Sequence, residues 1–366
     1  GALCAPIYQT STFEFETVEQ GGARFAGQEA GYIYSRLGNP TVGIVEAKMA
    51  ELEGGEDALA TASGMGAIST AIWSSVEAGD EIVACDTLYG CTYALLNHGI
   101  CKFGVRVTFI DMTDLEALKA ALTSKTKVVY LETPCNPTLK IVDIAAVAQI
   151  AHAYNADIKV MVDNTFCTPY LQRPLELGAD VVVHSATKYL NGHGDAMGGA
   201  ICTSDEQLYL QFQRMMGVIG CCMSPFNSFL IMRGIQTLPL RMERHCDNAE
   251  AIVAWLAKQP YVYNLTYPGL AGHPQHALAK RQLKRFGGML GFQLACDHDT
   301  LYNIVLKELR LFKHWVSLGE AHSLISPKDA DPEKGIPADF IRVSAGLENS
   351  GDLIADLEQA FSKVRW

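Results

Sequence analysis

The chain lacks several features that would assign it to a membrane, secreted or nucleic-acid-binding class. No apolar run reaches the roughly 18 residues of a transmembrane helix. No signal peptide is visible, although the abrupt start at Gly1 leaves a removed leader open. The 11 cysteines form no C-x-x-C pair and have no regular spacing, which favours free thiols in a reducing cytoplasm over a disulfide framework. The 29 Lys and Arg against 40 Asp and Glu give a net charge of −11, which argues against nucleic acid or an anionic membrane as the main partner.

The length of 366 residues, with 49% of them hydrophobic, allows one large domain and a smaller one. Residues 1–38 are rich in Gly, Thr, Ser and Tyr without strong periodicity, and predict an extended N-terminal arm. In residues 39–237, short apolar runs alternate with helical stretches, which predicts a large α/β domain with a mostly parallel, doubly wound sheet. Residues 238–366 change pattern and predict a smaller C-terminal α/β domain.

Several elements can be placed from local signals. Asn39 before Pro40 predicts the start of a helix, because Asn caps helices well and Pro suits the first helical position. In the smaller domain we expect helices near 248–258 and 352–363 and strands at 289–294 and 340–344. Short apolar runs predict strands of the larger sheet at 58–61, 81–84, 128–131, 159–162 and 181–183.

Lys188 is the most informative residue of the chain. It ends the segment His-Ser-Ala-Thr-Lys directly after the apolar run 181–183, so Ser185, Thr187 and Lys188 lie on a turn at the carboxyl end of a predicted strand. Open α/β sheets bind ligands at that edge. A lysine beside hydroxyls that can hold a phosphate suits a Schiff-base cofactor such as pyridoxal phosphate (PLP). Taken alone, the segment fits a solvated surface lysine better than a catalytic one, and the rest of the sequence reverses that balance.

Three further polar residues follow predicted strands. Asp163 comes after a wholly apolar run, and a carboxylate there is costly to bury unless it has a partner such as a pyridinium N–H. Tyr89 can stack on a flat ring and act as an acid or base, and Asn136 can hydrogen-bond a ring hydroxyl. Each also has a structural interpretation: a helix N-cap for Asp163, a half-buried loop position for Tyr89 and an Asx turn for Asn136.

Gly64 and Gly66 open a predicted helix after the first strand, where backbone N–H groups and the helix dipole can hold a phosphate. The alternative is a tight turn that needs glycine. The segment is also close to a dinucleotide-binding pattern, with Ser69 in place of its last glycine and Asp86 in place of its ribose-binding acid. That rival leaves the lysine, aspartate and tyrosine unexplained. A phosphate loop, ring stacker, Asn, Asp and Lys at the ends of successive strands together indicate a PLP site.

The sequence resembles the Cys/Met-metabolism family of fold-type I PLP-dependent enzymes over nearly its whole length. The resemblance implies that Lys188 carries the cofactor as a Schiff base and that Asp163 pairs with the pyridine nitrogen. It also implies that the phosphate is held by Gly64, Met65, Ser185 and Thr187. The motifs that carry the resemblance are Tyr-Ile-Tyr-Ser-Arg-Leu-Gly-Asn-Pro at 32–40, Ser-Gly-Met at 63–65, Val-Asp-Asn-Thr at 162–165 and Ser-Ala-Thr-Lys-Tyr at 185–189.

By the same resemblance, Tyr34 and Arg36 reach into the site of a neighbouring subunit and bind its phosphate. Their alternate positions in an extended segment place both side chains on one side. An active dimer would then be required, and a homotetramer built as a dimer of dimers is the expected assembly. Arg342 resembles the arginine that clamps the substrate α-carboxylate, assisted by Asn136 and Ser317. Its alternative is an exposed strand arginine.

Two positions favour the methionine γ-lyase branch of the family. Cys91 lies two residues after Tyr89 where cystathionine enzymes typically have glycine, although a small buried hydrophobic role also fits it. Val316 stands where cystathionine lyases typically carry a glutamate for the distal ammonium of their substrate. The expected reaction is α,γ-elimination of L-methionine or homocysteine to methanethiol or hydrogen sulfide, 2-oxobutanoate and ammonia. Lys188 would move the α- and β-protons, and Tyr89, its pKa lowered by Arg36, would protonate the thiolate.

Alternatives within the family are a cystathionine γ-lyase and an O-acetylhomoserine sulfhydrylase. From another class, a catalytically silent binding protein would keep the fold without turnover. Two stretches are shorter than the family pattern, one after Val218 and one after Ile325. One explanation, which we favour, is that mobile active-site loops of the protein are left out of the sequence, which is joined across the gaps. The other is that the protein itself lacks these loops, which would put the substrate lid and the activity in doubt.

Overall fold

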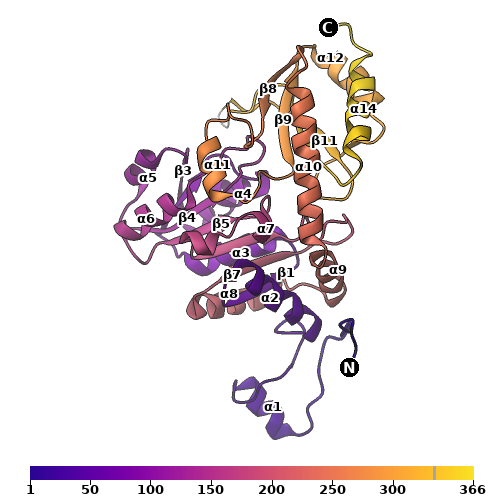
Figure 1. The fold of residues 1–366 in the computed structure, drawn as a ribbon. Coiled ribbons are helices and arrows are strands. Elements are labelled where there is room, and N and C mark those ends of the chain that lie inside the picture. Colours follow the sequence, from indigo (N-terminus) through magenta and orange to yellow (C-terminus); the bar gives the residue numbers. More distant parts are fainter. Residues whose placement is uncertain (333–334) are drawn as a thin grey trace.

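The computed structural model describes residues 1–332 and 335–366 and contains two β-sheets (Figure 1). The first sheet has seven strands and the second has five. A long helix, α10 (Leu238–Leu256), runs along the second sheet, and the N-terminal arm projects away from both sheets. In the described part of the chain, no helix combines the length and the apolar composition needed to cross a membrane.

The seven-stranded sheet consists of β1 (Asp57–Thr61), β2 (Glu81–Cys85), β3 (Arg106–Ile110), β4 (Thr126–Glu132), β5 (Lys159–Asp163), β6 (Val181–Ser185) and β7 (Gly199–Thr203). Their order is β1-β7-β6-β5-β4-β2-β3. The pairs from β6 to β3 are parallel, and β7 lies antiparallel between β1 and β6. The carboxyl ends of β2, β4, β5 and β6 therefore meet at one edge, as expected for a mostly parallel sheet.

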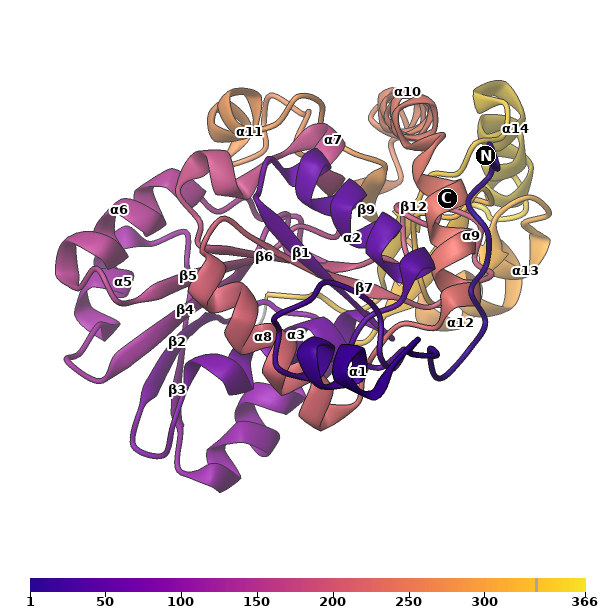
Figure 2. The ribbon, with the colours of Figure 1, turned by 90° about the horizontal axis from the view of Figure 1, so that it is seen from below.

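Helices cover both faces of this sheet. They are α2 (Pro40–Glu53), α3 (Gly64–Ser75), α4 (Gly90–Ala94), α5 (Leu115–Ala121), α6 (Ile144–Tyr154), α7 (Thr168–Leu171), α8 (Glu206–Ile219) and α9 (Pro225–Ile235). Figure 2 shows α2 and α7 on one face and α3 and α8 on the other. In β6, Val181 and Val183 pack with α3 and α8, whereas Val182 packs with α2. Alternate residues of a strand face opposite sides, so an all-apolar strand is buried on both.

The five-stranded sheet consists of β8 (Val262–Thr266), β9 (Met289–Leu294), β10 (Lys313–His314), β11 (Leu324–Lys328) and β12 (Phe340–Ser344), in the order β10-β11-β12-β9-β8. The helices α10 and α14 (Ser350–Phe361) share an apolar core with it that includes Leu256, Phe292 and Leu357. Shorter segments are α11 (His276–Gln282), α12 (His298–Thr300), α13 (Leu306–Glu308) and the 3-10 or π turns η1 (Leu95–Gly99), η2 (Ile100–Phe103), η3 (Pro174–Leu177) and η4 (Leu301–Val305).

Most predicted elements are confirmed, with three differences. Asn39 caps α2 by accepting a hydrogen bond from the Thr41 N–H, and β9 and β12 match their predicted ranges. The arm is not wholly extended, because it contains α1 (Val18–Phe25). The helix expected at 248–258 is the second half of α10, which begins earlier. Five strands were missed, β3 and β7 in the larger sheet and β8, β10 and β11 in the smaller one. The candidate residues therefore do not follow successive strands along the chain, although β2, β4, β5 and β6 are neighbours in the sheet.

The predicted division into residues 1–38, 39–237 and 238–366 stays a proposal. The two sheets lie on either side of its second boundary, since β7 ends at Thr203 and β8 begins at Val262.

A buried polar cluster joins α2 to the strands that end at the site. Glu53 and His184 have fully buried side chains, and Glu53 Oε1 lies 2.5 Å from His184 Nε2. The same oxygen accepts a hydrogen bond of 2.9 Å from Asn164 Nδ2. Because His184 is on β6 and Asn164 follows β5, one carboxylate of α2 ties both strands to the helix behind them.

We expect Glu53→Ala to destabilise the protein by ~3–5 kcal/mol, because the buried His184 and Asn164 side chains lose their shared partner. Urea unfolding followed by tryptophan fluorescence measures the effect. Glu51→Ala on the same helix is the matched control, because its side chain is 71% exposed and its loss should change stability by about 0.5 kcal/mol or less. Equal unfolding midpoints for the two variants would contradict the assigned role of Glu53.

Candidate active site

Lys188 lies on the turn that follows β6 and reaches a residue near the second sheet. Its Nζ donates a hydrogen bond of 2.8 Å to Ser317 Oγ. Burial lowers the pKa of Lys188 below its usual range, and the Arg342 guanidinium lowers it further, while Glu320 acts in the opposite direction. A lysine with a lowered pKa supplies the neutral amine that attacks an aldehyde carbon.

Asp163 ends β5, the strand next to β6, and is 7% exposed. Its Oδ1 accepts a hydrogen bond of 3.0 Å from the Thr165 N–H. Burial raises the pKa of Asp163. In the described ranges, no Lys, Arg or His forms an ion pair with this carboxylate. A buried carboxylate of this kind is stabilised by a cationic N–H donor.

The N-terminus of α3 lies directly against the turn that carries the lysine. A Cβ on Gly64 would lie 2.8 Å from Ser185 Cβ, so a larger residue does not fit without displacing the turn. Met65 follows in the first turn of α3, and Thr187 Oγ1 accepts a hydrogen bond of 3.1 Å from the Gly198 N–H. Free N–H groups at a helix start, with hydroxyls opposite them, form an anion-binding site.

Arg342 on β12 brings the second sheet to this edge. It is 6% exposed, and its Nη1 donates a hydrogen bond of 2.9 Å to Asn136 Oδ1, 206 residues away in the chain. Its Nη2 donates a hydrogen bond of 2.8 Å to the Ser317 carbonyl oxygen. Burial lowers the pKa of Arg342, and its Nε is buried without a hydrogen-bond partner among the described residues. This unused donor fits a carboxylate that enters the site.

Comparison with known proteins identifies the family. The model of the Cys/Met metabolism PLP-dependent enzymes matches residues 1–362. The chain belongs to this family. It is 50% identical to the L-methionine γ-lyase of Fusobacterium nucleatum subsp. nucleatum, over all of this chain and 94% of that protein, and L-methionine γ-lyases of other bacteria are 48 to 50% identical. A cystathionine β-lyase of Coxiella burnetii is 43% identical, over 98% of this chain and 93% of that protein. The crystal structure of metB from Corynebacterium glutamicum has a TM-score of 0.93 at 38% identity, over all of this chain and 94% of that chain.

Family membership makes PLP the cofactor and fold type I the fold. The side chains at the sheet edge fit this cofactor. Asp163 offers a buried carboxylate without a cation, and Lys188 offers an amine. The start of α3 offers backbone N–H donors at Gly64, where the absence of a side chain lets the backbone approach Ser185 closely. These are the groups that a pyridine nitrogen, an aldehyde and a phosphate require.

Tyr89 and Cys91 lie together after β2. The Cys91 Sγ is 3.5 Å from the Tyr89 hydroxyl. The pKa of Tyr89 is raised to about 12, first by this hydrogen bond, then by burial and by negative charge, including that of Glu132. The expectation that Arg36 lowers this pKa concerns the Arg36 of a neighbouring subunit and stays a prediction. Within the single chain, Arg36 Nη1 donates a hydrogen bond of 2.5 Å to the Gly217 carbonyl oxygen.

Five predicted site residues are exposed in the single chain, namely Tyr34, Arg36, Tyr89, Cys91 and Val316. Tyr34 is 41% exposed on the arm, with the Arg36 guanidinium 5.6 Å from the centre of its ring. Val316 precedes Ser317 in the chain but is 70% exposed, and it lines a surface pocket of 550 Å³. A single chain thus brings Lys188, Asp163, the start of α3 and Arg342 to one edge of the sheet, and it leaves the arm residues exposed.

Glu132 belongs to this edge and was not predicted. It ends β4, is 5% exposed and accepts hydrogen bonds from the backbone N–H groups of Tyr89 and Asn136. Burial and the neighbouring Asp163 raise the pKa of Glu132. The signal was present in the sequence, because Glu132 follows the apolar run 128–131 as Asp163 follows its own run, and the two pair in register.

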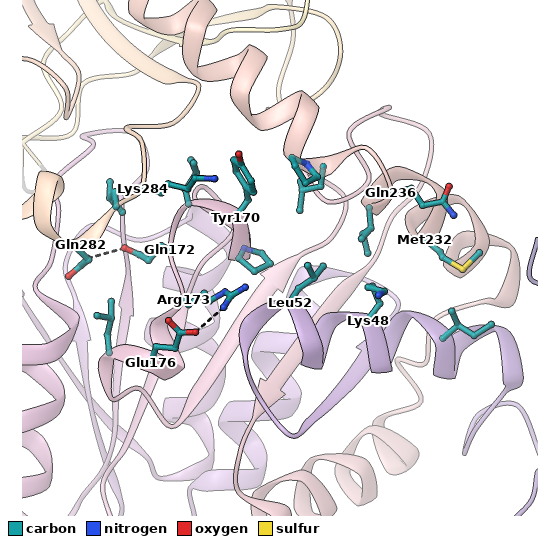
Figure 3. Close-up of a pocket in the computed structure, with 18 of the residues that line it drawn as sticks. Lys48, Leu52, Tyr170, Gln172, Arg173, Glu176, Met232, Gln236, Gln282 and Lys284 are labelled. Carbon is teal, nitrogen blue, oxygen red and sulfur yellow. Dashed lines mark hydrogen bonds and ion pairs between the residues drawn. The ribbon is translucent and has the colours of Figure 1, made fainter.

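A large pocket lies elsewhere in the molecule. It has a volume of 1060 Å³ and lies between α2, α7 and the junction of α9 with α10 (Figure 3). Its lining includes Lys48 and Leu52 of α2, Tyr170 of α7 and Met232 of α9, and no predicted site residue. Pocket size therefore does not locate the candidate site residues in this fold, whereas the carboxyl ends of the parallel strands do.

We expect the rate of covalent PLP incorporation into cofactor-stripped protein to rise with pH, with a midpoint below the ordinary lysine value of 10.5. Burial disfavours the charged form of Lys188, so the reactive neutral amine is already populated at a lower pH than in water. Stopped-flow absorbance of the Schiff base measures the rate. The reference is a free lysine derivative reacting with PLP, and Lys188→Ala controls for other lysines. A midpoint equal to that of the free amine would contradict the lowered pKa.

Proposed function

We propose that the protein is a PLP-dependent L-methionine γ-lyase. It converts L-methionine, and also homocysteine, by α,γ-elimination into methanethiol or hydrogen sulfide, 2-oxobutanoate and ammonia. The observation that carries the proposal is the full-length identity of 48 to 50% with L-methionine γ-lyases, against 43% with a cystathionine β-lyase. The Cys91 thiol beside the Tyr89 hydroxyl supports it.

In this proposal, Arg342 binds the α-carboxylate of the substrate. Its buried Nε lacks a protein partner, and its other nitrogens are held by Asn136 Oδ1 and the Ser317 carbonyl oxygen. A guanidinium fixed at two points is pre-organised for a planar carboxylate. The clamp selects amino acids without contacting the sulfur end of the substrate.

Lys188 and Tyr89 are the proton-transfer residues. When bound, PLP supplies an electron sink for the charge that develops at the substrate α-carbon. Lys188, whose pKa is lowered by burial, accepts the α-proton and later a β-proton. Tyr89, with a pKa of about 12, is protonated near neutral pH and gives its proton to the departing thiolate sulfur.

The remaining predicted residues hold the cofactor in this proposal. Asp163 keeps the proton on the ring nitrogen, because a buried carboxylate is stabilised by an N–H⁺ partner. The phosphate is bound by Gly64, Met65, Ser185 and Thr187, with Tyr34 and Arg36 contributed by a second subunit.

Cys91 and Val316 set the preference for an apolar thioether. The thiol packs beside the phenol at 3.5 Å, where it can tune the acid that meets the sulfur. Val316 places no carboxylate near the substrate tail, so a distal ammonium would lose water without gaining a partner. Cystathionine is therefore disfavoured relative to methionine.

We further propose a homotetramer, built as a dimer of active dimers, that works in the cytoplasm. The arm that carries Tyr34 and Arg36 extends away from the body of its own chain (Figure 1). It exposes several large apolar side chains, including Val18 at 88% and Phe25 at 70%, which a second subunit would cover. All eleven cysteines are free thiols, which suits a reducing compartment.

We expect the PLP-loaded protein to release methanethiol and 2-oxobutanoate from L-methionine and to act weakly on L-cystathionine. Assays of both products, with the two substrates in parallel, test this. A clear preference for cystathionine, or no elimination from either substrate, would move the function to another member of the family while leaving the Lys188 chemistry in place.

Cys91→Gly separates the contribution of the thiol. We expect it to lower the ratio of methionine to cystathionine turnover, because the glycine is the residue that cystathionine enzymes typically carry. Cys101→Gly is the matched control, since Cys101 is also an exposed free cysteine but was not assigned to the site. An unchanged ratio in Cys91→Gly would show that this residue does not determine specificity.

Subunit mixing tests whether the arm serves a neighbouring site. We expect Arg36→Ala and Lys188→Ala to be inactive separately and to regain activity when co-assembled, because one site of the mixed dimer then has both residues intact. The control pair is Lys188→Ala with Asp163→Asn, whose lesions lie in the same cluster of one chain, so that every mixed site lacks one of them. Absence of recovery in the first pair would mean that the arm serves its own chain.

A further inference from the structure

Glu132 occupies a position between two loops of the site. Its Oε2 accepts a hydrogen bond of 2.9 Å from the Tyr89 N–H, and its Oε1 accepts one of 3.0 Å from the Asn136 N–H. Tyr89 follows β2 and Asn136 follows β4, so one side chain holds the loops after two neighbouring strands. At 5% exposure, water does not take the place of either donor.

Only a carboxylate satisfies both loops from this position. A glutamine has one acceptor oxygen, and its NH₂ group would face the second backbone N–H. The carboxylate also has no cation to offset its burial, since none of the ion pairs in residues 1–332 and 335–366 includes Glu132. Its register partner on β5 is a second buried carboxyl group, Asp163. Packing alone therefore does not account for an acid at this place.

The bonds of Glu132 continue through the substrate clamp to the lysine. Asn136 Oδ1 accepts the bond of 2.9 Å from Arg342, and Arg342 donates one of 2.8 Å to the Ser317 carbonyl oxygen. The Ser317 hydroxyl in turn accepts the 2.8 Å bond from Lys188. The acid at Tyr89, the carboxylate clamp and the lysine are thus connected, and Glu132 is the link between the first and the second.

We propose that Glu132 is a positioning residue that fixes the Tyr89 loop and the Asn136–Arg342 clamp relative to each other, so that leaving group and carboxylate are held at one spacing. The inference rests on the proposed roles of Tyr89 and Arg342 in elimination. Glu132 itself does not contact the substrate. Its influence is exerted through two backbone N–H groups, which set where the phenol and the amide oxygen lie.

The first test compares Glu132→Gln with Glu81→Gln. Glu81 is also 5% exposed, but it lies at the opposite end of β2, bound to Arg106 and Thr123. We expect Glu132→Gln to lower kcat/KM for L-methionine on the order of 100-fold, because displacements of about 1 Å have effects of that size. Both parameters should change, with kcat falling through Tyr89 and KM rising through Asn136. Equal kinetic effects of the two variants would overturn the proposal.

Double-mutant cycles separate the effect of Glu132 on the Tyr89 loop from its effect on the Asn136 loop. In a Tyr89→Phe background, the effect of Glu132→Gln on kcat should shrink, because the acid that it positions is already absent. In an Asn136→Ala background, the effect on KM should shrink in the same way. Effects that add fully in both backgrounds would mean that Glu132 acts through neither loop.

A binding measurement keeps this test separate from the proposed function. Glycine carries the α-carboxylate but no leaving group, so its dissociation constant, read from the change in cofactor absorbance, does not depend on elimination. We expect Glu132→Gln to weaken glycine binding by about tenfold or more, and Glu81→Gln to leave it unchanged. If the wild-type chain fails on methionine, the proposed function fails, and the glycine result still decides the role of Glu132.

Stability is controlled with a shorter carboxylate. Glu132→Asp keeps two acceptor oxygens but lacks one methylene group, so it should bind glycine better than Glu132→Gln and less well than the wild type. If Glu132→Gln does not fold, Glu132→Asp takes its place against Glu81→Asp. Wild-type glycine affinity and kinetics in Glu132→Asp, with Glu132→Gln also unaffected or unfolded, would overturn the positioning role.

Discussion

The site depends on one helix that holds segments of two sheets against each other. Arg241 on α10 is 5% exposed and donates a hydrogen bond of 2.6 Å to the carbonyl oxygen of Tyr189, the residue after the site lysine. One turn further along, His245 Nδ1 lies 2.6 Å from the Ala345 carbonyl oxygen, three residues beyond the clamp arginine. Residues four apart lie on the same helix face. The helix α10 therefore sets the distance between the Lys188 amine and the Arg342 guanidinium, and the proposed chemistry depends on that distance.

The contacts of Arg241 also restrict which residues can occupy the neighbouring positions. Arg241 is a buried cation that is held by carbonyl oxygens, including those of Leu190 and Gly234, and burial lowers its pKa to about 10, so it is still charged near neutral pH. A Cβ on Gly192 would lie 2.0 Å from the Arg241 guanidinium, and Gly192 has a φ of +72°. Space and backbone conformation both require glycine there. The turn that carries Lys188 is thus shaped by its contacts with α10.

The sequence was informative where the signal is local. Asp163 and Lys188 could be found because each directly follows a buried apolar strand, and the same rule applied to Glu132 would have found it. The two missed strands of the larger sheet lack such a signal: β3 begins with an exposed arginine and is only half-buried, and β7 begins with Gly-Ala. The bond between Asn136 and Arg342 spans 206 residues and arises only when the two sheets meet. The raised pKa of Tyr89 could not be anticipated either, because it depends on which side chains the fold places around the phenol and not on spacing.

Burial favours the neutral form of each ionisable group of the site, which shifts the pKa of bases and acids in opposite directions. It lowers the pKa of Lys188 and raises those of Asp163 and Glu132, because each charged form has lost its water. Asp163 has no ion-pair partner among the described residues, and the Arg342 Nε has no acceptor. In the proposed function, a pyridinium N–H and a substrate carboxylate supply these two partners. Because they bind the folded chain and not the unfolded one, they stabilise the fold by mass action. In that proposal, the two groups that lack a partner in the chain are the ones that give it affinity for cofactor and substrate.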